Sequence, residues 1–214
     1  MNALVIFVKY PEKGKVKTRL AKSIGEKKAM ELYTAFLHDL LKEHSNQNYD
    51  LYVYISPVEK AKQFEKEFEA PHYAIQTGAN LGNKIFNSIK ELLGLYKKVV
   101  MVPSDVPTLK EKTISDSFFH LDQADVVLGP ASDGAFYLIG MKEPHDILTE
   151  ATWGDNKTLL KEVLQIASKQ KVSVFLMKEI VHDVDTIEDL QKLKPEIHSR
   201  PDSETAKLLK KLKI

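Results

Sequence analysis

The sequence predicts an α/β fold, namely a three-layer α/β/α sandwich around a mainly parallel, mixed sheet. Apolar, β-branched runs alternate with helix-like patterns through most of the chain, which is typical of parallel βαβ units. Two later strand-like runs are separated by six residues, too few for a crossover helix, so we expect some antiparallel pairing. The chain of 214 residues, 43% of them hydrophobic, fits one domain over residues 1–214.

The first expected element is a strand at residues 3–8. All six positions are apolar, as in a central strand that is covered on both faces. After a loop, one apolar stripe at helical spacing predicts a helix over about 26–42. The same criteria predict strands at 51–55, 73–76, 99–102, 125–129, 136–141, 172–177 and 180–184, and helices at 59–68, 85–93, from 110, at 158–167, from 187 and, as a terminal amphipathic helix, over 202–214.

Charge and composition exclude several classes of protein. Lysine and arginine number 31 against 30 acidic residues, so the net charge of +1 gives no reason to expect nucleic acid or an anionic membrane as a partner. The absence of cysteine excludes disulfides, thiolate metal sites and a cysteine nucleophile, and it fits a reducing cytoplasm. No stretch approaches the roughly 20 apolar residues of a membrane span. We expect a soluble, cytoplasmic protein.

The loop after the first strand is a candidate phosphate-binding segment. Residues 9–19 hold five basic side chains and one acid directly before the helical region. Gly14 permits close backbone approach, and Lys17 and Arg19 could line one side of an extended loop. The alternative is a solvated, lysine-rich surface loop, but the position at a strand's carboxyl end favours phosphate. The segment is neither a Walker A loop nor a G-x-G-x-x-G dinucleotide motif.

Asp105 is the candidate metal ligand. It follows the strand at 99–102 and stands between two prolines, which suits a carboxylate held for Mg²⁺ or Mn²⁺, although aspartate is also common in turns and helix caps. A second carboxylate could come from Asp133, or from Asp183 and Asp185 near the end of a late strand. The run from Thr186 also has the pattern of a helix start, and this explains the acids after it but not Asp183 and Asp185.

Other chemistry-bearing residues give weaker signals. No histidines form the i, i+4 pair of a zinc helix, and His182, beside the acidic run, is most simply a bystander. No G-x-S-x-G elbow supports nucleophilic hydrolysis. Trp153, the only tryptophan, lies in a polar loop, so both core packing and a place in an acceptor pocket fit it.

Six ordered motifs then connect the sequence with a known superfamily. The motifs are FVKYPEKGKVKTRLA, TGANLG, PSDVPTL, GPASDGAFYLIG, ATWGDNKTL and DVDTIEDL. With them the chain resembles the nucleotide-diphospho-sugar transferases, which have a GT-A-like fold. Within that superfamily it is similar to a small bacterial glycosyltransferase-like family that is associated with radical-SAM and arsenosugar gene clusters. It is more distantly similar to guanylyltransferases of the phospholactate and molybdopterin type.

This resemblance implies roles for individual residues. Asp105 would be the first ligand of a Mg²⁺ or Mn²⁺ ion and Asp185 the second, with Asp183 as a substitute for Asp185. Asp133, as a candidate base, and Gly134 would face the acceptor, and Lys17, Arg19 and Asp105 would join Asp133 in catalysis. The nucleotide-binding residues would be Lys9, Gly14, Lys17 and Arg19 at the phosphates, and Gly78, Leu81 and Gly82 at the base.

Three functions are compatible with these residues. The leading hypothesis is metal-dependent glycosyl transfer from a nucleotide-sugar to a small-molecule acceptor. The alternative is a nucleotidyltransferase that joins an NTP to a phosphorylated small molecule and releases pyrophosphate. A nucleotide-binding domain without catalysis would retain the same fold.

Overall fold

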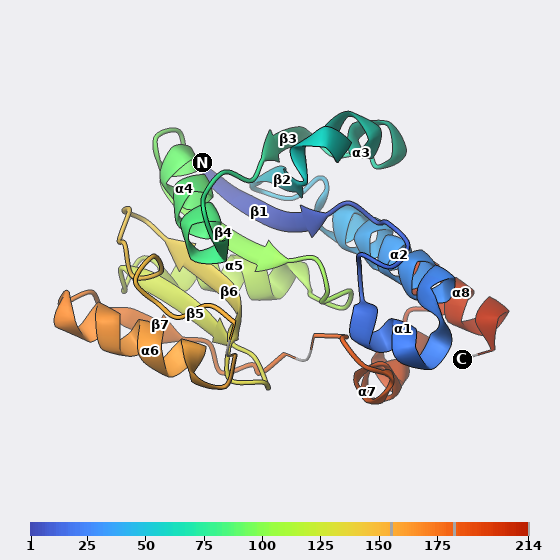
Figure 1. Cartoon of the computed structure of the whole chain (residues 1–214). Coiled ribbons are helices and arrows are strands. Elements are labelled where there is room, and N and C mark those ends of the chain that lie inside the picture. Colours follow the sequence, from blue (N-terminus) through green and yellow to red (C-terminus); the bar gives the residue numbers. More distant parts are fainter. Residues whose placement is uncertain (155, 182, 214) are drawn as a thin grey trace.

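The computed structural model describes residues 1–154, 156–181 and 183–213, and Asp155, His182 and Ile214 lie outside that description (Figure 1). The strands are β1 (Asn2–Lys9), β2 (Asp50–Ser56), β3 (His72–Ile75), β4 (Lys98–Pro103), β5 (Val126–Pro130), β6 (Phe136–Met141) and β7 (Val174–Leu176). They form one sheet in the order β3-β2-β1-β4-β6-β5-β7. Within the described residues β6 alone runs antiparallel to its neighbours, which confirms the predicted mixed, mainly parallel sheet.

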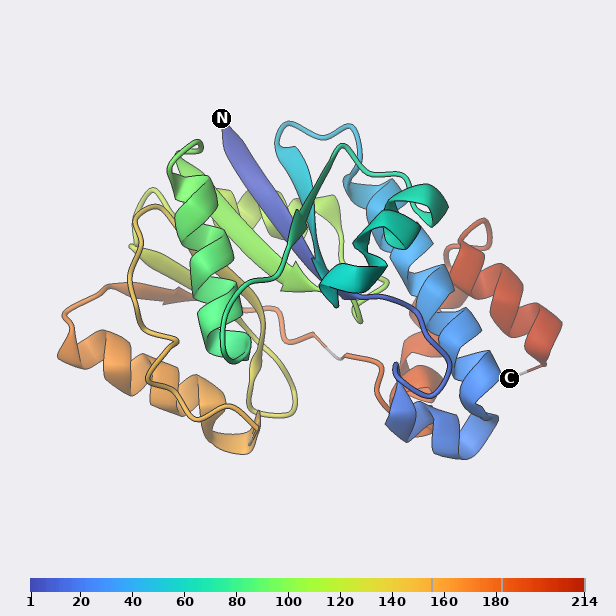
Figure 2. The same ribbon diagram turned by 45° about the horizontal axis from the view of Figure 1, so that its top comes forward.

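Helices cover both faces of this sheet, so the predicted three layers are confirmed (Figures 1 and 2). The helices are α1 (Thr18–Ile24), α2 (Glu26–His44), the 3₁₀ turn η1 (Val58–Lys60), α3 (Ala61–Glu67), α4 (Leu81–Leu93), α5 (Glu111–His120), α6 (Asn156–Lys169), α7 (Ile187–His198) and α8 (Glu204–Leu212). Side chains of α2, α3, α5, α7 and α8 contribute to the core on one face, and those of α4 and α6 to the core on the other.

Strand β1 explains why the first apolar run has no polar face. Leu4 and Ile6 belong to the core on the α2 side, whereas Val5 and Phe7 belong to the core on the α4 side. Successive side chains of a strand point to opposite faces, so a strand covered on both sides must be apolar throughout. Leu4, Val5 and Ile6 are fully buried, and replacing Leu4 or Ile6 by alanine would cost about 2–5 kcal/mol.

Two segments differ from the sequence-based expectation. The loop before α2 contains a further helix, α1, which buries only Leu20 and therefore shows no apolar periodicity. The expected strand at 180–184 is wrong for the described residues, because Val181 makes one isolated bridge, to Ala131, and 183–185 are irregular. The backbone N–H of Val184 donates to the carbonyl of Asp105 at 3.2 Å, so this segment crosses to the loop after β4 instead of extending the sheet.

Candidate metal and nucleotide site

Three chain segments meet at the carboxyl ends of β1 and β4. These strands are parallel neighbours, with Phe7 opposite Pro103, so the loops that follow them start side by side. The segment before α7 joins them through the hydrogen bond from Val184 to Asp105. In open α/β sheets ligands bind beyond the carboxyl strand ends, so this edge is the expected place for a site.

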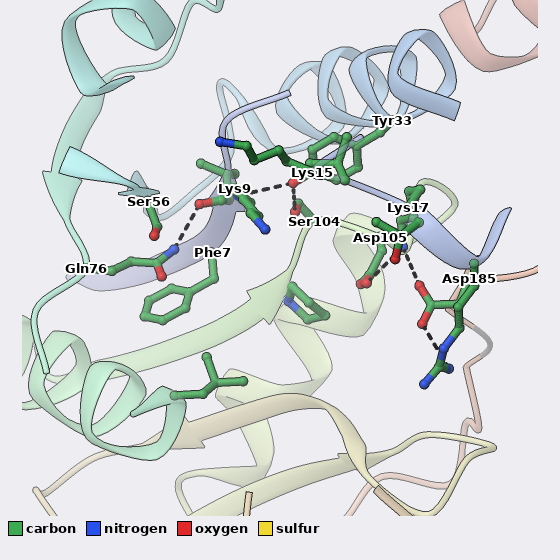
Figure 3. Close-up of a pocket in the computed structure, with 16 residues that line it drawn as sticks. Phe7, Lys9, Lys15, Lys17, Tyr33, Ser56, Gln76, Ser104, Asp105 and Asp185 are labelled. Atoms are coloured by element: carbon green, nitrogen blue, oxygen red, sulfur yellow. Dashed lines mark hydrogen bonds and ion pairs between the residues drawn. The ribbon is translucent and has the colours of Figure 1, made fainter. Parts of the chain in front are cut away.

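Lys17 lies at the centre of the meeting point. It precedes α1 in a left-handed conformation, φ 47°, and its side chain is only 5% exposed. The ammonium group donates to Asp105 Oδ2 at 3.1 Å and to Asp185 Oδ1 at 2.9 Å, and Figure 3 shows the three side chains converging. Burial by itself would lower the pKa of Lys17, but the two carboxylate charges outweigh it and raise the pKa, so Lys17 is cationic.

Three aspartates form the acidic part of the site. Asp105, Asp183 and Asp185 each offer a carboxylate oxygen, and these atoms lie within 4.8 Å of one another. Burial, followed by the charges of Asp105 and Asp185, raises the pKa of Asp183 to about 6. Arg19 adds an ion pair with Asp185 at 3.5 Å. Thr186 forms a capping box with Asp189, so the predicted helix start is also present.

The geometry of these aspartates fits a hard cation. Oδ1 of Asp105 is buried and has no hydrogen-bond partner, which is unfavourable for a carboxylate unless an ion or water satisfies it. Mg²⁺ and Mn²⁺ prefer carboxylate oxygens, and two or three carboxylates within reach of one ion form a common donor set. Asp105, Asp183 and Asp185 are therefore the residues of the described chain that could hold a metal ion.

A buried hydroxyl links the ends of β1 and β4 to α2. The Tyr33 hydroxyl lies 2.7 Å from Ser104 Oγ and accepts the backbone N–H of Lys9 at 3.2 Å. Sequence periodicity assigned Tyr33 to the apolar stripe of its helix and gave no sign of this contact. This link fixes Lys9, the first residue of the basic segment 9–19, relative to Asp105.

A cavity of about 440 Å³, here called the basic cavity, opens beside Asp105 and Asp185 (Figure 3). It has the size of a small-molecule site. Among the predicted residues it takes in Lys9, Lys17, Arg19, Leu81, Asp105 and Asp185. It also includes Ser56 and Gln76, which sequence reasoning missed because a single polar residue after a short strand carries no pattern. The Gln76 amide donates to the carbonyls of Val8 at 2.9 Å and Tyr54 at 2.8 Å, which holds it in the wall.

A second cavity of about 460 Å³, here called the apolar cavity, adjoins the first and shares Phe7, Leu81, Pro103 and Asp105 with it. It includes the predicted residues Asp133 and Asp183. Asp133 accepts the N–H of Ala135 at 3.0 Å and the amide of Asn156 at 2.5 Å, and these bonds orient its carboxylate. Trp153 lines this cavity as well, so one side chain serves both packing and a pocket wall.

Four predicted glycines lie outside both cavity linings. Gly14 and Gly78 have φ of +75° and +147°, so they supply backbone conformations that other residues rarely adopt. Gly82 packs beneath Trp153, where an added Cβ would lie 2.2 Å from the indole nitrogen, and Gly134 packs against the backbone of Lys157. Direct contact of these glycines with a nucleotide or acceptor remains a prediction. His182 lies outside the described residues.

The fold and this site define a class. The chain belongs to the superfamily of nucleotide-diphospho-sugar transferases and nucleotidyltransferases. A solved structure from Desulfovibrio desulfuricans G20, described as a "putative nucleotide-diphospho-sugar transferase", is 30% identical, covers 98% of this chain and 94% of its own, and superimposes with a TM-score of 0.90.

Within that class the chain is a member of the DUF2064 family, "Uncharacterized protein conserved in bacteria", whose model matches residues 40–155. A 2-phospho-L-lactate guanylyltransferase of Methanobrevibacter smithii is 26% identical over 203 residues, covering 92% of this chain and 85% of the relative. Rv0371c of Mycobacterium tuberculosis H37Rv, solved as a complex with manganese, is 12% identical, covers 90% of this chain and 96% of its own, and has a TM-score of 0.51, so it shares the fold. Among the described residues no helix is long and apolar enough to cross a membrane.

Proposed function

We propose that this protein is a metal-dependent transferase that binds a nucleotide-sugar in the basic cavity and transfers its glycosyl group to an acceptor hydroxyl. The observation that carries the proposal is the position of Asp105, which lines both cavities and belongs to the aspartate cluster. A donor diphosphate and an acceptor can then approach one another at the same carboxylate. The similarity to the Desulfovibrio desulfuricans structure, described as a "putative nucleotide-diphospho-sugar transferase", supports this choice.

The metal residues are assigned from the cluster geometry. Asp105 and Asp185 would hold Mg²⁺ or Mn²⁺, with Asp183 as a third or substitute ligand. When bound, the ion would supply positive charge to the diphosphate that leaves. The manganese complex of Rv0371c, a distant structural relative, agrees with a divalent ion at this fold.

The remaining roles fall to the side chains of the two cavities. Lys9, Lys17 and Arg19 would neutralise the donor phosphates, and Arg19 can offer two parallel donors to one phosphate. The bond from the anomeric carbon to the phosphate oxygen breaks, and a bond from that carbon to the acceptor oxygen forms. Asp133 is the candidate base that takes the acceptor's proton, and its two hydrogen bonds hold it for that step.

Nucleotidyl transfer is the second candidate, because the guanylyltransferase relative aligns with 92% of this chain. In that reaction a phosphate oxygen of the acceptor attacks the α-phosphate of an NTP, and pyrophosphate leaves. The same aspartates and basic residues would serve it, so the aspartate cluster alone does not separate the two reactions.

The product separates them. The protein would be incubated with Mg²⁺ or Mn²⁺, a panel of nucleotide-sugars and NTPs, and mixed small-molecule acceptors. Nucleoside diphosphate release supports glycosyl transfer, and pyrophosphate release supports the second candidate. Asp105→Asn should abolish either product, whereas Asp116→Asn, an exposed carboxylate paired with Lys112 on α5, should not. Nucleotide binding without any product would identify a non-catalytic binding domain, and no binding would refute the whole proposal.

A further inference from the structure

On the basis of the proposed transfer, we propose that the acceptor is an uncharged alcohol with an apolar or aromatic face that binds in the apolar cavity. Nothing in the family or relative names specifies such an acceptor. The charge and the walls of that cavity indicate the chemical class of the second substrate.

The two cavities differ in the sign of their charge. The basic cavity contains four cations, Lys9, Lys15, Lys17 and Arg19, against two carboxylates, Asp105 and Asp185. Among the described residues that line the apolar cavity, the charged side chains are Asp105, Asp133 and Asp183, and no lysine, arginine or histidine is present. A phosphorylated or carboxylated acceptor would place like charges side by side, which costs several kcal/mol. A metal at the aspartate cluster would offset that cost only where it touches the anion.

The walls of the apolar cavity are largely hydrophobic. Ile85 and Met101, which are 3% and 4% exposed, are among its lining residues. The Trp153 indole donates to the carbonyl of Leu148 at 2.9 Å, and its ring meets Phe136 edge to face with centroids 6.2 Å apart. The close packing against Gly82 holds the same ring from another side. A fixed aromatic surface of this kind favours the apolar face of a ring or a hydrocarbon chain.

The carboxylates of the apolar cavity include two members of the aspartate cluster, Asp105 and Asp183. Asp133 and Asp183 can accept a hydrogen bond from an alcohol, and Asp105 is shared with the basic cavity. A hydroxyl beside these carboxylates would lie next to the donor, while the rest of the molecule packs against Trp153 and Phe136. One apolar wall and a few convergent acceptors are what an uncharged alcohol requires.

Trp153 provides a direct test, because it is the only tryptophan of the chain and lines this cavity. The probes are phenyl β-D-glucopyranoside and its 6-phosphate, which differ in one anionic group. Each is titrated against the full-length protein while tryptophan emission is followed, first with EDTA and then with Mg²⁺. We expect a saturable change with the neutral glucoside and at least tenfold weaker binding of the phosphate in both conditions.

Two variants of α6 test the role of charge. Asn156→Lys adds a cation at the exposed rim of the cavity and should reduce the preference for the neutral probe at least threefold. Gln165→Lys adds the same charge at an exposed position of α6 outside the cavity lining, and should leave the preference unchanged. Equal or tighter binding of the phosphate by the unmodified protein, or no response to either probe, overturns the inference.

Nucleotide binding is measured separately by calorimetry, so the two proposals can fail independently. Loss of nucleotide binding with the probe preference intact removes the proposed donor and leaves the assigned class of ligand for the apolar cavity. Intact nucleotide binding with a preference for the phosphate removes the uncharged acceptor and favours the guanylyltransferase-like reaction.

Discussion

Replacing Lys17 by methionine should destabilise the metal-free protein by about 3 kcal/mol. The change removes an ammonium that is 5% exposed and contacts Asp105 and Asp185 at 3.1 and 2.9 Å. At an effective dielectric constant of about 20, each contact corresponds to roughly 5 kcal/mol of attraction, offset by several kcal/mol for the desolvation of the charges. Breaking a buried pair from one side costs about 3–5 kcal/mol, and the partial exposure of the two carboxylates places the value at the lower end.

The assay is urea unfolding at pH 7.5 with EDTA, repeated with Mg²⁺. Lys15→Met is the matched control, since this side chain is 64% exposed and pairs with Glu12 at 3.4 Å, and it should cost less than about 0.5 kcal/mol. Because the ammonium no longer competes for the carboxylates, Mg²⁺ should stabilise the Lys17 variant more than the unmodified protein. A destabilisation equal to that of the control would refute the assignment of Lys17 as the internal counter-ion.

Three further predictions concern pH and backbone strain. Burial lowers the pKa of His44 to about 4 in the folded protein, whereas the unfolded chain binds this proton below about pH 6.5. Acid therefore favours the unfolded state. Lowering the pH from 7 to 5 should therefore cost the unmodified protein about 2 kcal/mol more than it costs His44→Gln in urea unfolding. The raised pKa of Asp183 has the opposite effect on the pH dependence of stability. Burial destabilises the ionised carboxylate, and this form predominates above about pH 6. In EDTA, Asp183→Asn should be more stable than the unmodified protein by about 1–2 kcal/mol at pH 8, and thermal unfolding should show the gap closing towards pH 4. Gly134→Ala should lose about 2 kcal/mol or more, because its Cβ would lie 2.7 Å from the carbonyl of Lys157, whereas Gly154→Ala, also at positive φ but with no atom within 4 Å, should lose about 1 kcal/mol. Equal losses for the two glycines would show that backbone conformation alone sets the cost.

The layers of the fold could be predicted because buried strands and helices show characteristic apolar patterns in the sequence. Strand β1 is apolar at every position and α2 carries one buried stripe, so both were recognised within two residues of their ends. Helix α1 buries a single side chain, so its sequence shows no apolar pattern. Residues 183 and 184 were wrongly included in the strand expected at 180–184, because Val184 donates a hydrogen bond to Asp105, far away in the sequence, and its conformation does not follow from a local preference.

The candidate site was predictable only in part for the same reason. The ends of β1 and β4 are visible in the sequence, so Lys17 and Asp105 could be singled out from the loops that follow them. Asp185 follows no strand in the structure, and its role was implied by the family resemblance. The mutual distances of these three residues, and the burial of the lysine between the two acids, depend on the sheet order. The division into a basic and an apolar cavity could not be predicted from the sequence. Residues such as Phe7 and Leu81 line both cavities, so their position in the chain does not assign them to one of the two.

The contact of Lys17 with Asp185 joins positions 168 residues apart, and this separation has a consequence for biosynthesis. Closing so long a loop is slow compared with forming the local βα units that precede it. While the chain emerges from the ribosome, β1, α2 and β4 can assemble without the last acid, and Lys17 then faces Asp105 alone. The proposed cation and nucleotide site would therefore be completed late, after most of the sheet has formed.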